Sequence, residues 1–341
     1  MNLGSPESYQ VKDLKRYLSQ FLMDKRVIDY PYIFRKILVD GIIVPFRAAK
    51  SAEAYRTIWT KNGSPLIAWT KKQELELRKK LDKPIEIAMR YGEPSIDFAF
   101  KSLIQSTPKL DNVLAIPLYP HYAMSSYETA VEQARDVHKK RGYRFALEFF
   151  RPFFDNKDYI TALANRIRPY LQNQYDHLLF SFHGIPERHL KRSDPTGKHC
   201  LQSADCCSTT SLAHLTCYRH QCFKTMNLVT KQLQIPQSKF SYSFQSRLGR
   251  EQWLRPYTDF RLQEMPDEGI KRLLIICPAF VSDCLETLEE IEIRGRESFL
   301  SAGGKFYEMI PCLNDLESWI ETMAGWIKNY FEGNREMILT I

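Results

Sequence analysis

Short apolar segments alternate with longer segments of helical periodicity along the whole chain of 341 residues, and this alternation constrains the fold more than any other feature. Strands that are joined by helical crossovers run in the same direction, so the pattern predicts an α/β fold with parallel sheets flanked by helices. The clearest strands are expected at residues 112–118, 178–182 and 272–277. Helices are expected at residues 127–140, 160–172, 223–234 and 284–301, with a final helix at about 316–331.

A faint internal repeat indicates two similar halves. Residues 112–132 and 272–290 each contain an apolar strand, a proline, an aromatic residue, a serine and a Glu-Thr-x-x-Glu motif. A chance match is the alternative explanation. If the repeat is structural, it predicts two domains of similar topology facing each other across a cleft. The expected division is 1–150, 151–313 and a segment at 314–341 whose helix packs back on the first domain.

Composition and charge narrow the class of protein. The chain is 44% hydrophobic and 26% charged, which is typical of a soluble globular protein, and no apolar run approaches the ~20 residues that span a bilayer. The first ten residues lack a basic region followed by an apolar one, so we expect no secretory signal and a cytoplasmic location. The net charge of +8 fits an ordinary solvated surface, an acidic small molecule or an anionic membrane. Basic residues spread along the chain without a known motif argue against nucleic acid.

The apolar strand at 178–182 stops abruptly at His183-Gly184. In an open α/β sheet ligands bind at the carboxyl ends of the strands, so a histidine at this position is placed for chemistry. The alternative is that His183 caps the strand and hydrogen-bonds to the next loop. A second segment, residues 277–291, brings carboxylates to the end of another apolar strand and favours the chemical interpretation.

Glu286 and Glu290 lie four residues apart and therefore on one face of the expected helix. Without a cation the two carboxylates repel each other slightly, so such a face could pass a divalent metal inward or accept protons. Asp283 and Glu286 also have the spacing of a capping box, which is the structural alternative for that pair. A capping box does not explain Glu290.

Five of the eight cysteines fall between residues 200 and 222. Cytosolic proteins seldom form disulfides, so clustered thiols suggest a metal site, with independent thiols as the alternative. Zinc favours Cys-x2–4-Cys pairs, and only Cys217 and Cys222 have that spacing, whereas iron–sulfur clusters tolerate irregular spacing. The side chains that could ligate zinc instead are His199, His214 and His220.

Taken together, the motifs resemble the ferrochelatase family, whose members insert ferrous iron into protoporphyrin IX to form protohaem, the last step of haem biosynthesis. The most specific are SFHGIP at 181–186 and Asp283-x-x-Glu286-Thr-Leu. The others follow in order as NLGSP, YRTIWTKNGSPL, AMRYGEP, PLYPHYAMSSYET, SRLGREQWLRPYTD and AGGKFYEMIP. The resemblance covers nearly the whole chain and implies the class II chelatase fold, with two Rossmann-like domains facing across a porphyrin cleft.

The resemblance also implies roles for individual residues. His183 would be the inner imidazole, Glu286 would stand opposite it with Asp283 beside it, and His183, Glu286 and Glu290 would contact the substrate iron. The candidate wall residues of the porphyrin slot are Met89, Tyr119, Tyr122 and Trp253, and the candidate propionate contacts are Arg47, Lys50 and Ser64. Which side of the ring receives iron is left open.

Some bacterial ferrochelatases carry a 2Fe–2S cluster on an internal cysteine-rich segment, and residues 199–223 resemble that type. The ligands would then be Cys200, Cys207, Cys217 and Cys222, with Cys206 as the alternate for Cys207. The expected partners are protoporphyrin IX and ferrous iron, with peripheral contact at the inner membrane face as a further option; the oligomeric state is not indicated.

The chain departs from the family pattern at two places. Family members usually have an apolar strand before the NLGSP motif, so the first strand is expected to be truncated here. His121 stands where glutamine is more frequent, and it is expected to add a titratable group near the cleft. Two alternative functions stay open: a chelatase for coproporphyrin or sirohydrochlorin, and a non-catalytic iron- or redox-sensing relative.

Overall fold

The computed structural model describes every residue except 248, 250 and 340–341. The chain forms two compact units. The first unit contains Met1–Tyr119, Met124–Pro152 and Met323–Ile341, and the second contains Pro120–Ala123 and Phe153–Thr322. The chain enters the second unit briefly at Pro120–Ala123 and again at Phe153, and it returns to the first unit at Met323.

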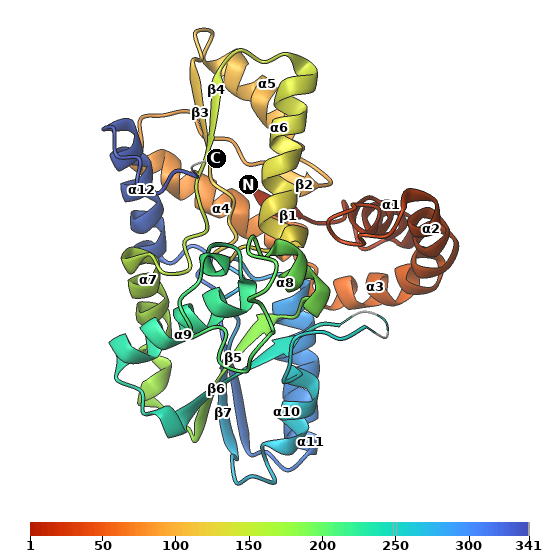
Figure 1. Ribbon diagram of the computed structural model, residues 1–341, viewed down its shortest axis with the longest axis vertical. Helices are drawn as coiled ribbons and strands as arrows, with labels where there is room; N and C mark the ends of the chain where they lie inside the picture. Colours follow the sequence, from red (N-terminus) through yellow and green to blue (C-terminus); the bar gives the residue numbers. More distant parts are fainter. Residues whose placement is uncertain (248, 250, 340–341) are drawn as a thin grey trace. The chain divides into compact units, whose positions relative to one another are not determined.

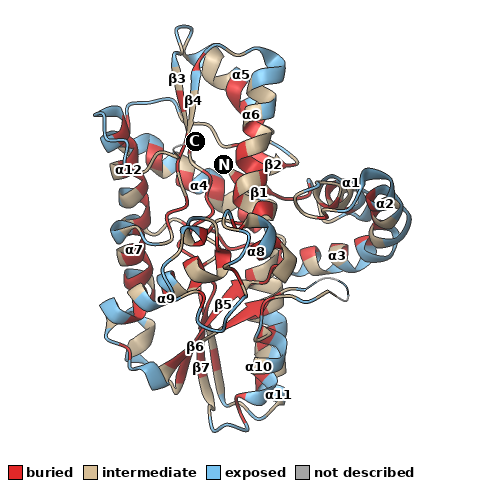
Figure 2. Cartoon of the chain, in the orientation of Figure 1, coloured by how far each residue is buried: buried red, intermediate tan, exposed pale blue. Residues whose placement is uncertain are grey.

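The second unit is built on one parallel sheet of four strands (Figure 1). All neighbouring strands are parallel, which requires a crossover between each pair. The central strand is fully buried from Leu178 to Phe182, as expected for a strand covered on both faces (Figure 2). In spatial order the strands are β6 (Phe240–Gln245), β5 (His177–His183), β7 (Arg272–Ile276) and β8 (Phe306–Ile310).

Helices supply the crossovers of the second unit, and one face of the sheet packs against a core that includes Leu262, Ile291 and Phe299. Helix α7 begins at a capped position, because the Asn156 side chain accepts hydrogen bonds from two backbone amides. The helical elements are α7 (Lys157–Ile167), η3 (Tyr170–Gln172), α8 (Glu187–Ser193), η4 (Leu212–Leu215), α9 (Tyr218–Leu233), η5 (Gln237–Lys239), α10 (Thr258–Glu264), η6 (Glu286–Gly295) and α11 (Arg296–Ser301). Helix α12 (Glu317–Phe331) begins in the second unit and ends in the first.

The first unit contains two parallel two-stranded sheets instead of one larger sheet. Its strands are β1 (Asn2–Gly4) with β2 (Met89–Tyr91), and β3 (Asn112–Ala115) with β4 (Ala146–Phe149). The helical elements are α1 (Val11–Leu22), α2 (Tyr32–Lys36), η1 (Ile37–Ile43), α3 (Val44–Ile58), α4 (Pro65–Lys80), α5 (Ile96–Ser106), η2 (Met124–Glu128) and α6 (Thr129–Arg141). Among the residues described, no helix combines the length and the apolar character needed to cross a membrane.

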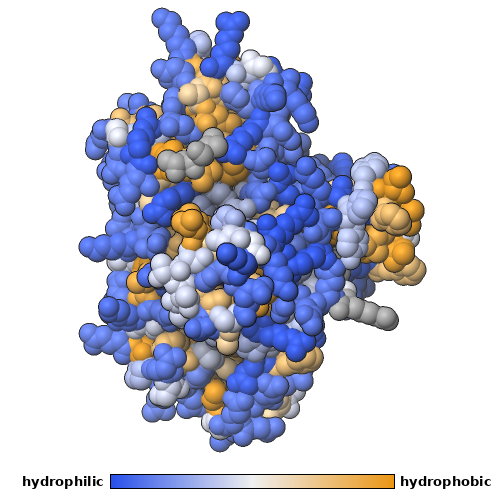
Figure 3. Space-filling view, in the orientation of Figure 1, coloured by the Kyte–Doolittle hydropathy of each residue, from blue (hydrophilic) through white to orange (hydrophobic). Residues whose placement is uncertain are grey.

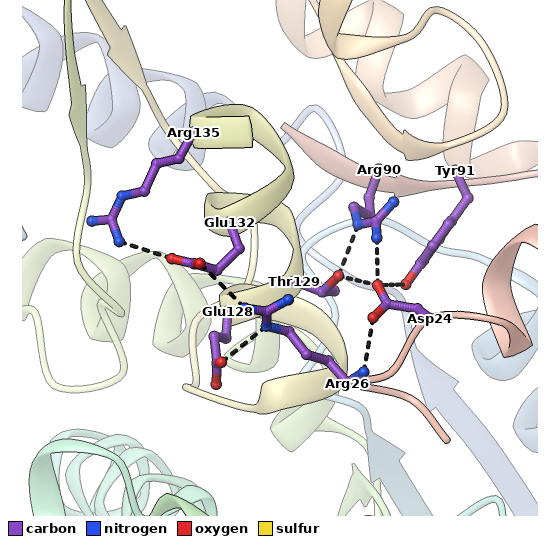
Figure 4. A network of polar contacts seen from close by, with 8 residues as sticks. All are labelled: Asp24, Arg26, Arg90, Tyr91, Glu128, Thr129, Glu132 and Arg135. Atoms are coloured by element: carbon purple, nitrogen blue, oxygen red, sulfur yellow. Dashed lines mark hydrogen bonds and ion pairs between the residues drawn. The ribbon is translucent and has the colours of Figure 1, made fainter. Parts of the chain in front are cut away.

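The helices α1, α2, η1 and α3, which we call the arm, have a small core of their own around Leu22, Val39 and Val44. A polar network fastens the arm to the rest of the first unit (Figure 4). The carboxylate of Asp24 accepts hydrogen bonds from side chains on β2 and α6, and Arg26 forms ion pairs with two glutamates of η2 and α6. The residues of the network are Asp24, Arg26, Arg90, Tyr91, Glu128, Thr129, Glu132 and Arg135.

Both acidic helices depart from the expected geometry in the same way. Residues 124–128 and 286–295 are π-helical, and each segment is followed directly by an α-helix, whereas the sequence predicted ordinary helices at 127–140 and 284–301. A π-turn contains an extra residue per hydrogen-bonded loop, a feature that often occurs at functional sites. In both units a strand is followed by a π-helical segment at the Glu-Thr-x-x-Glu motif; this segment contains the whole motif in the second unit and only its first glutamate in the first.

Candidate functional site

His183 is the last residue of β5, at the carboxyl edge of the second unit's sheet. Its Nδ1 atom lies 2.6 Å from the carbonyl oxygen of Gly184, and its own carbonyl accepts a hydrogen bond of 2.8 Å from the Tyr218 hydroxyl. A Cβ atom on Gly184 would lie 2.9 Å from the carbonyl oxygens of Gln245 and Ser246, so only glycine fits this close approach. The backbone around His183 is thus held from both sides.

Gln245, the last residue of β6, connects His183 to the acidic helix. It is the register partner of His183, and its amide nitrogen donates a hydrogen bond of 3.0 Å to the backbone carbonyl of Glu286. Its side-chain oxygen accepts a bond of 2.8 Å from the Ser181 hydroxyl. Sequence analysis missed Gln245 as a site residue; the available signal was a Gln-Ser pair ending an apolar strand, as His183 ends β5.

The acidic pair Glu286 and Glu290 lies on η6, and both side chains are half-buried. Burial, together with the neighbouring charge of Glu286, raises the pKa of Glu290 to about 7. The Ser246 hydroxyl donates a hydrogen bond to the Glu290 carboxylate, and Arg294 lies 3.5 Å from it. Glu290 therefore exchanges a proton near neutral pH, as required of a group that accepts protons or a divalent cation.

Asp283 is buried and makes its hydrogen bonds within the protein. Its Oδ1 atom accepts a bond of 3.0 Å from the Thr287 hydroxyl, and its Oδ2 atom accepts one of 2.6 Å from the Asn314 amide. Thr287 also accepts a bond from the backbone N–H of Cys284, so η6 begins with an Asp283–Thr287 contact. These contacts hold the loop that leads into η6, whose first residue is Glu286.

The two wall candidates of the second unit lie in different surroundings. Trp253 packs against the turn at Gly184, because its ring carbon Cε3 would lie 3.3 Å from a Cβ atom added to that glycine. Trp253 also forms an isolated antiparallel β-bridge with Pro186. Tyr122 is half-buried, and its backbone N–H donates a bond of 2.6 Å to the Gln221 side chain. Trp253 therefore lies close to His183, whereas Tyr122 is tied to α9.

The remaining candidates belong to the first unit. Met89 and Tyr119 are buried, and within the described part of the chain the Tyr119 hydroxyl has no hydrogen-bond partner. Arg47 and Lys50 are exposed on α3. Ser64 is buried and accepts a hydrogen bond of 2.7 Å from Ser5.

His121, expected to add a titratable group, is buried in the second unit. Its Nε2 atom lies 2.9 Å from the Thr225 hydroxyl, and its ring packs against Phe182 and Tyr218. Burial lowers its pKa to about 3, so it stays neutral near pH 7. The sequence predicted a titratable group here but did not reveal the burial that keeps it neutral.

The thiols of the cysteine-rich segment gather around Cys217. A hydrogen bond from the thiol of Cys207 lowers the pKa of Cys217 to about 6, and the backbone N–H of His220 and then the thiol of Cys200 add to the effect. Cys206 and Cys222 are also buried, and all these cysteines are free. A thiolate surrounded by thiols is a suitable donor set for an iron–sulfur cluster. Over the described residues, however, no group of three or more side chains is arranged to hold a metal ion in this conformation.

The three histidines of this segment hold its backbone. His199 and His214 bond through Nε2 to the carbonyl of Cys206, at 2.7 and 3.0 Å, and His220 bonds through Nδ1 to the carbonyl of Cys207 at 2.7 Å. Because a carbonyl only accepts, each of these nitrogens donates a proton and cannot bind a metal at the same time. The second ring nitrogen of each histidine keeps its lone pair, so these hydrogen bonds are compatible with thiolate ligands and with the histidine–zinc alternative.

Comparisons with known proteins agree with this geometry. The family model described as Ferrochelatase matches residues 1–330. The chain is 47% identical to the ferrochelatase of Pseudomonas entomophila over 96% of this chain and 97% of that protein, and 47% identical to the ferrochelatase of Stutzerimonas stutzeri, with 95% of each covered. Among solved structures, SirB from Bacillus subtilis with Fe3+ matches with a TM-score of 0.53 and 14% identity over 81% of this chain and 96% of that one. At that identity the likeness shows the chelatase fold alone.

Proposed function

This chain belongs to the ferrochelatase family, and from that membership we propose which of its residues carry the insertion of ferrous iron into protoporphyrin IX that completes haem synthesis. The protein is an enzyme of the lyase class that forms nitrogen–metal bonds. One observation carries the assignment of residues. His183 is the register partner of Gln245, and the same Gln245-Ser246 segment bonds to Glu286 and Glu290, so the histidine and the acidic pair lie at one edge of the sheet. The alternative substrate sirohydrochlorin receives no support beyond the shared fold.

We assign His183 as the base that removes pyrrole protons. Metal insertion requires two pyrrole protons to leave while the macrocycle bends to expose its nitrogen lone pairs. Because Nδ1 of His183 bonds to the carbonyl of Gly184, Nδ1 carries the proton in the neutral ring and Nε2 keeps its lone pair. A neutral imidazole with a fixed free lone pair is suited to accept a proton.

The carboxylates Glu286 and Glu290 are assigned to the opposite side of the ring. Because Glu290 ionises near neutral pH, the pair can bind either a proton or a divalent cation. Binding of the cation releases the proton, and binding of a proton releases the cation. Asp283 would act as a positioning residue, because both of its oxygens hold the loop before η6.

The porphyrin contacts follow from surroundings and chemistry. Trp253 beside the Gly184 turn and the buried Tyr119, with its unpaired hydroxyl, are proposed as wall residues together with Met89 and Tyr122. The exposed cations Arg47 and Lys50 are proposed to meet the propionates. Ser64 would join them only by giving up its bond with Ser5.

The test is porphyrin metallation, followed by loss of porphyrin fluorescence with ferrous iron or zinc under anaerobic conditions. We expect His183→Ala to lower the turnover number at least about 100-fold, which is the usual range for a lost general base. The matched control is His177→Gln at the amino end of the same strand, which should retain activity. Near-normal turnover of the folded His183→Ala variant would refute the assignment.

We further propose that Cys200, Cys207, Cys217 and Cys222 hold a 2Fe–2S cluster, with Cys206 as the alternate for Cys207. The thiolate character of Cys217, together with the histidines that fix the Cys206-Cys207 backbone, supports a thiolate site. When bound, the cluster supplies a redox-sensitive structural link in this segment. Inserting ferrous iron into a porphyrin transfers no electron, so we assign the cluster no step in catalysis.

Anaerobically purified protein should contain about two iron and two sulfide ions per chain and absorb visible light. Cys217→Ser should remove the iron, the sulfide and the colour. Cys277 is buried just after β7, and Cys277→Ser should leave all three unchanged. Colourless protein with stoichiometric zinc would contradict the proposal.

We also propose that the arm contacts an anionic membrane surface. Large apolar side chains are exposed along residues 30–46, with Ile33 and Phe34 each 69% and Phe46 80% accessible, and Figure 3 shows an apolar surface over α2. Exposed cations at Lys36, Arg47 and Lys50 lie on the same elements. Such a surface would allow an enzyme with a greasy substrate to take it up from lipid.

A further inference from the structure

The π-helical segment η6 receives hydrogen bonds from two side chains that lie outside the helix. The amide nitrogen of Gln245 lies 3.0 Å from the backbone carbonyl of Glu286, and the hydroxyl of Tyr307 lies 2.6 Å from the backbone carbonyl of Ile291. Gln245 ends β6 and Tyr307 lies on β8, so the donors come from the two edge strands of the sheet. Because π-geometry occurs mostly as single turns and η6 has ten residues, contacts from outside the helix are needed to keep it in this register.

Tyr307 is buried, and its hydroxyl reaches the helix through a gap that Gly295 leaves. A Cβ atom added to Gly295 would lie 2.8 Å from this hydroxyl oxygen, which is too close, and 3.2 Å from the nearest carbon of Leu262. The backbone of Gly295 has ordinary helical angles, φ −64° and ψ −43°, so its conformation does not require glycine. Glycine is a poor helix former, and the space that the Tyr307 hydroxyl occupies accounts for its presence here.

The side-chain amide of Gln245 is oriented by two donors at its oxygen. Its Oε1 atom lies 2.8 Å from the Ser181 hydroxyl and 3.4 Å from the Cys277 thiol, and both groups donate to it. The side chains of all three residues are buried. A flipped amide would place its oxygen against the carbonyl oxygen of Glu286, and two acceptors in contact repel each other. The hydrogen bond from Gln245 to the first residue of η6 is therefore fixed.

The register of η6 decides where Glu290 points relative to Glu286. In an α-helix the four residues between them make slightly more than one turn, because a turn takes about 3.6 residues. A π-helix has more residues in each turn, so the same four residues rotate through a smaller angle. A change to the α register around Ile291 would therefore rotate the Glu290 carboxylate about the helix axis, away from the Ser246 hydroxyl that donates a hydrogen bond to it.

We propose that Tyr307 and Gln245 are positioning residues that hold η6 in its π register, so that Glu286 and Glu290 together can bind a divalent cation. Gln245 fixes the segment at Glu286, and Tyr307 fixes it one residue beyond Glu290. Gly295 belongs to the same arrangement, because a residue with a Cβ atom would displace the Tyr307 hydroxyl. This role of Tyr307 and Gln245 rests on the proposed function of the two glutamates as cation ligands.

The role of Tyr307 is tested with Tyr307→Phe, which removes only the hydroxyl. A crystal structure of this variant should show α-helical hydrogen bonds around Ile291 in place of π-helical ones. In porphyrin metallation the KM for zinc should rise at least about tenfold, which is the usual loss when a residue that supports a metal ligand is removed, and the KM for the porphyrin should not change. A purely structural loss of folded enzyme would lower the rate and leave both KM values unchanged.

The matched control is Tyr127→Phe. Tyr127 is a buried tyrosine of the first unit whose hydroxyl lies 2.6 Å from the backbone carbonyl of Phe150, so the same kind of hydrogen bond is removed far along the chain from η6. This variant should keep the KM values of the unsubstituted enzyme.

Gly295→Ala tests the same contact from the side of the helix. The added methyl group should displace the Tyr307 hydroxyl, lower the unfolding temperature by at least about 3 °C and raise the KM for zinc. The double variant Tyr307→Phe, Gly295→Ala should recover most of the lost unfolding temperature, because the hydroxyl that collides with the methyl group is gone, but it should keep the raised KM. A double variant no more stable than Gly295→Ala would show that the hydroxyl does not fill the gap and would overturn the proposed role.

A crystal structure of Tyr307→Phe in which η6 keeps its π register would also overturn it. If the register changes and the KM for zinc does not, the assignment of Glu290 as a cation ligand fails, whereas Tyr307 still fixes the helix. The two failures are therefore distinguishable.

Discussion

At the scale of single residues, the site depends on short-range constraints that fix where a proton can reside. His183 is oriented by the carbonyl of the next residue, and Gly184 allows the approach of two carbonyl oxygens from β6. Glu290 acquires its pKa of about 7 from burial and from Glu286, and Ser246 donates a hydrogen bond to its carboxylate. The positions of His183 and the glutamates were predicted from the sequence, because each follows an apolar strand. Gln245 was not, because its role depends on a strand that is distant in sequence.

The pH dependence of metallation tests Glu290. A raised carboxyl pKa means that the carboxylate form appears only as pH rises through about 7, so the rate of zinc insertion should increase between about pH 6 and 8. In Glu290→Gln this ionisation is absent and the profile over the same interval should be flat. Glu297→Gln, at an exposed position on α11, is the control and should keep the wild-type profile. An unchanged ionisation in Glu290→Gln would rule out Glu290 as the titrating group.

At the scale of elements, the same acidic motif has different surroundings in the two units. In the first unit Glu128 and Glu132 form ion pairs with Arg26, which fastens the arm (Figure 4). In the second unit the Glu290 carboxylate accepts a hydrogen bond from the Ser246 hydroxyl, and the Arg294 guanidinium lies 3.5 Å from it. The repeat was visible in the sequence, but the partners of each copy were not, because Arg26 lies about a hundred positions away from its glutamates. From those partners we propose a structural role for the motif in the first unit and a chemical role in the second.

The arm's contact with lipid is tested by co-sedimentation with vesicles of phosphatidylcholine and phosphatidylglycerol. We expect the double variant Phe34→Ser, Phe46→Ser to lower the partition constant at least about tenfold, because each phenylalanine that enters an apolar phase contributes roughly 1.5–3 kcal/mol. The control is Leu212→Ser with Leu215→Ser, two leucines that are each 71% exposed in the second unit. Equal losses in the two double variants, or no binding by the unsubstituted protein, would contradict the proposal.

At the scale of the whole molecule, several carboxylates stabilise the fold through partners that are distant in sequence. Asp97 bonds to Lys101, Tyr143 and Arg141, and these contacts lower its pKa to about 2. Glu148, bonded first to Tyr330 near the end of the chain, also has a lowered pKa. A carboxyl group with a lowered pKa stabilises the folded state above its unfolded pKa, and that contribution is lost as pH falls through the folded value.

The contribution of Asp97 to the urea midpoint, measured as the difference between the wild type and Asp97→Asn, should therefore be constant from pH 7 to about 5 and should fall between about pH 4 and 2. Asp97→Asn should lower the midpoint at pH 7 and reduce the fall below pH 4, because the variant has already lost the contribution that acid removes. Asp136→Asn, on the helix that carries Arg141, is the control and should change neither. If Asp97→Asn shows the full acid-dependent fall, the lowered pKa of Asp97 does not contribute to stability.

The sequence by itself determined the α/β class and the alternation of strands with helices, and it placed His183, Glu286 and Glu290 after the ends of apolar strands. These depend on local periodicity and on what ends each strand, and both are properties of neighbouring residues. Only the tertiary structure decided that His121 is buried, that Gln245 joins His183 to η6, and that the acidic helices begin as π-turns. Burial and hydrogen-bond partnership depend on segments that meet only after folding, so no local pattern in the chain encodes them.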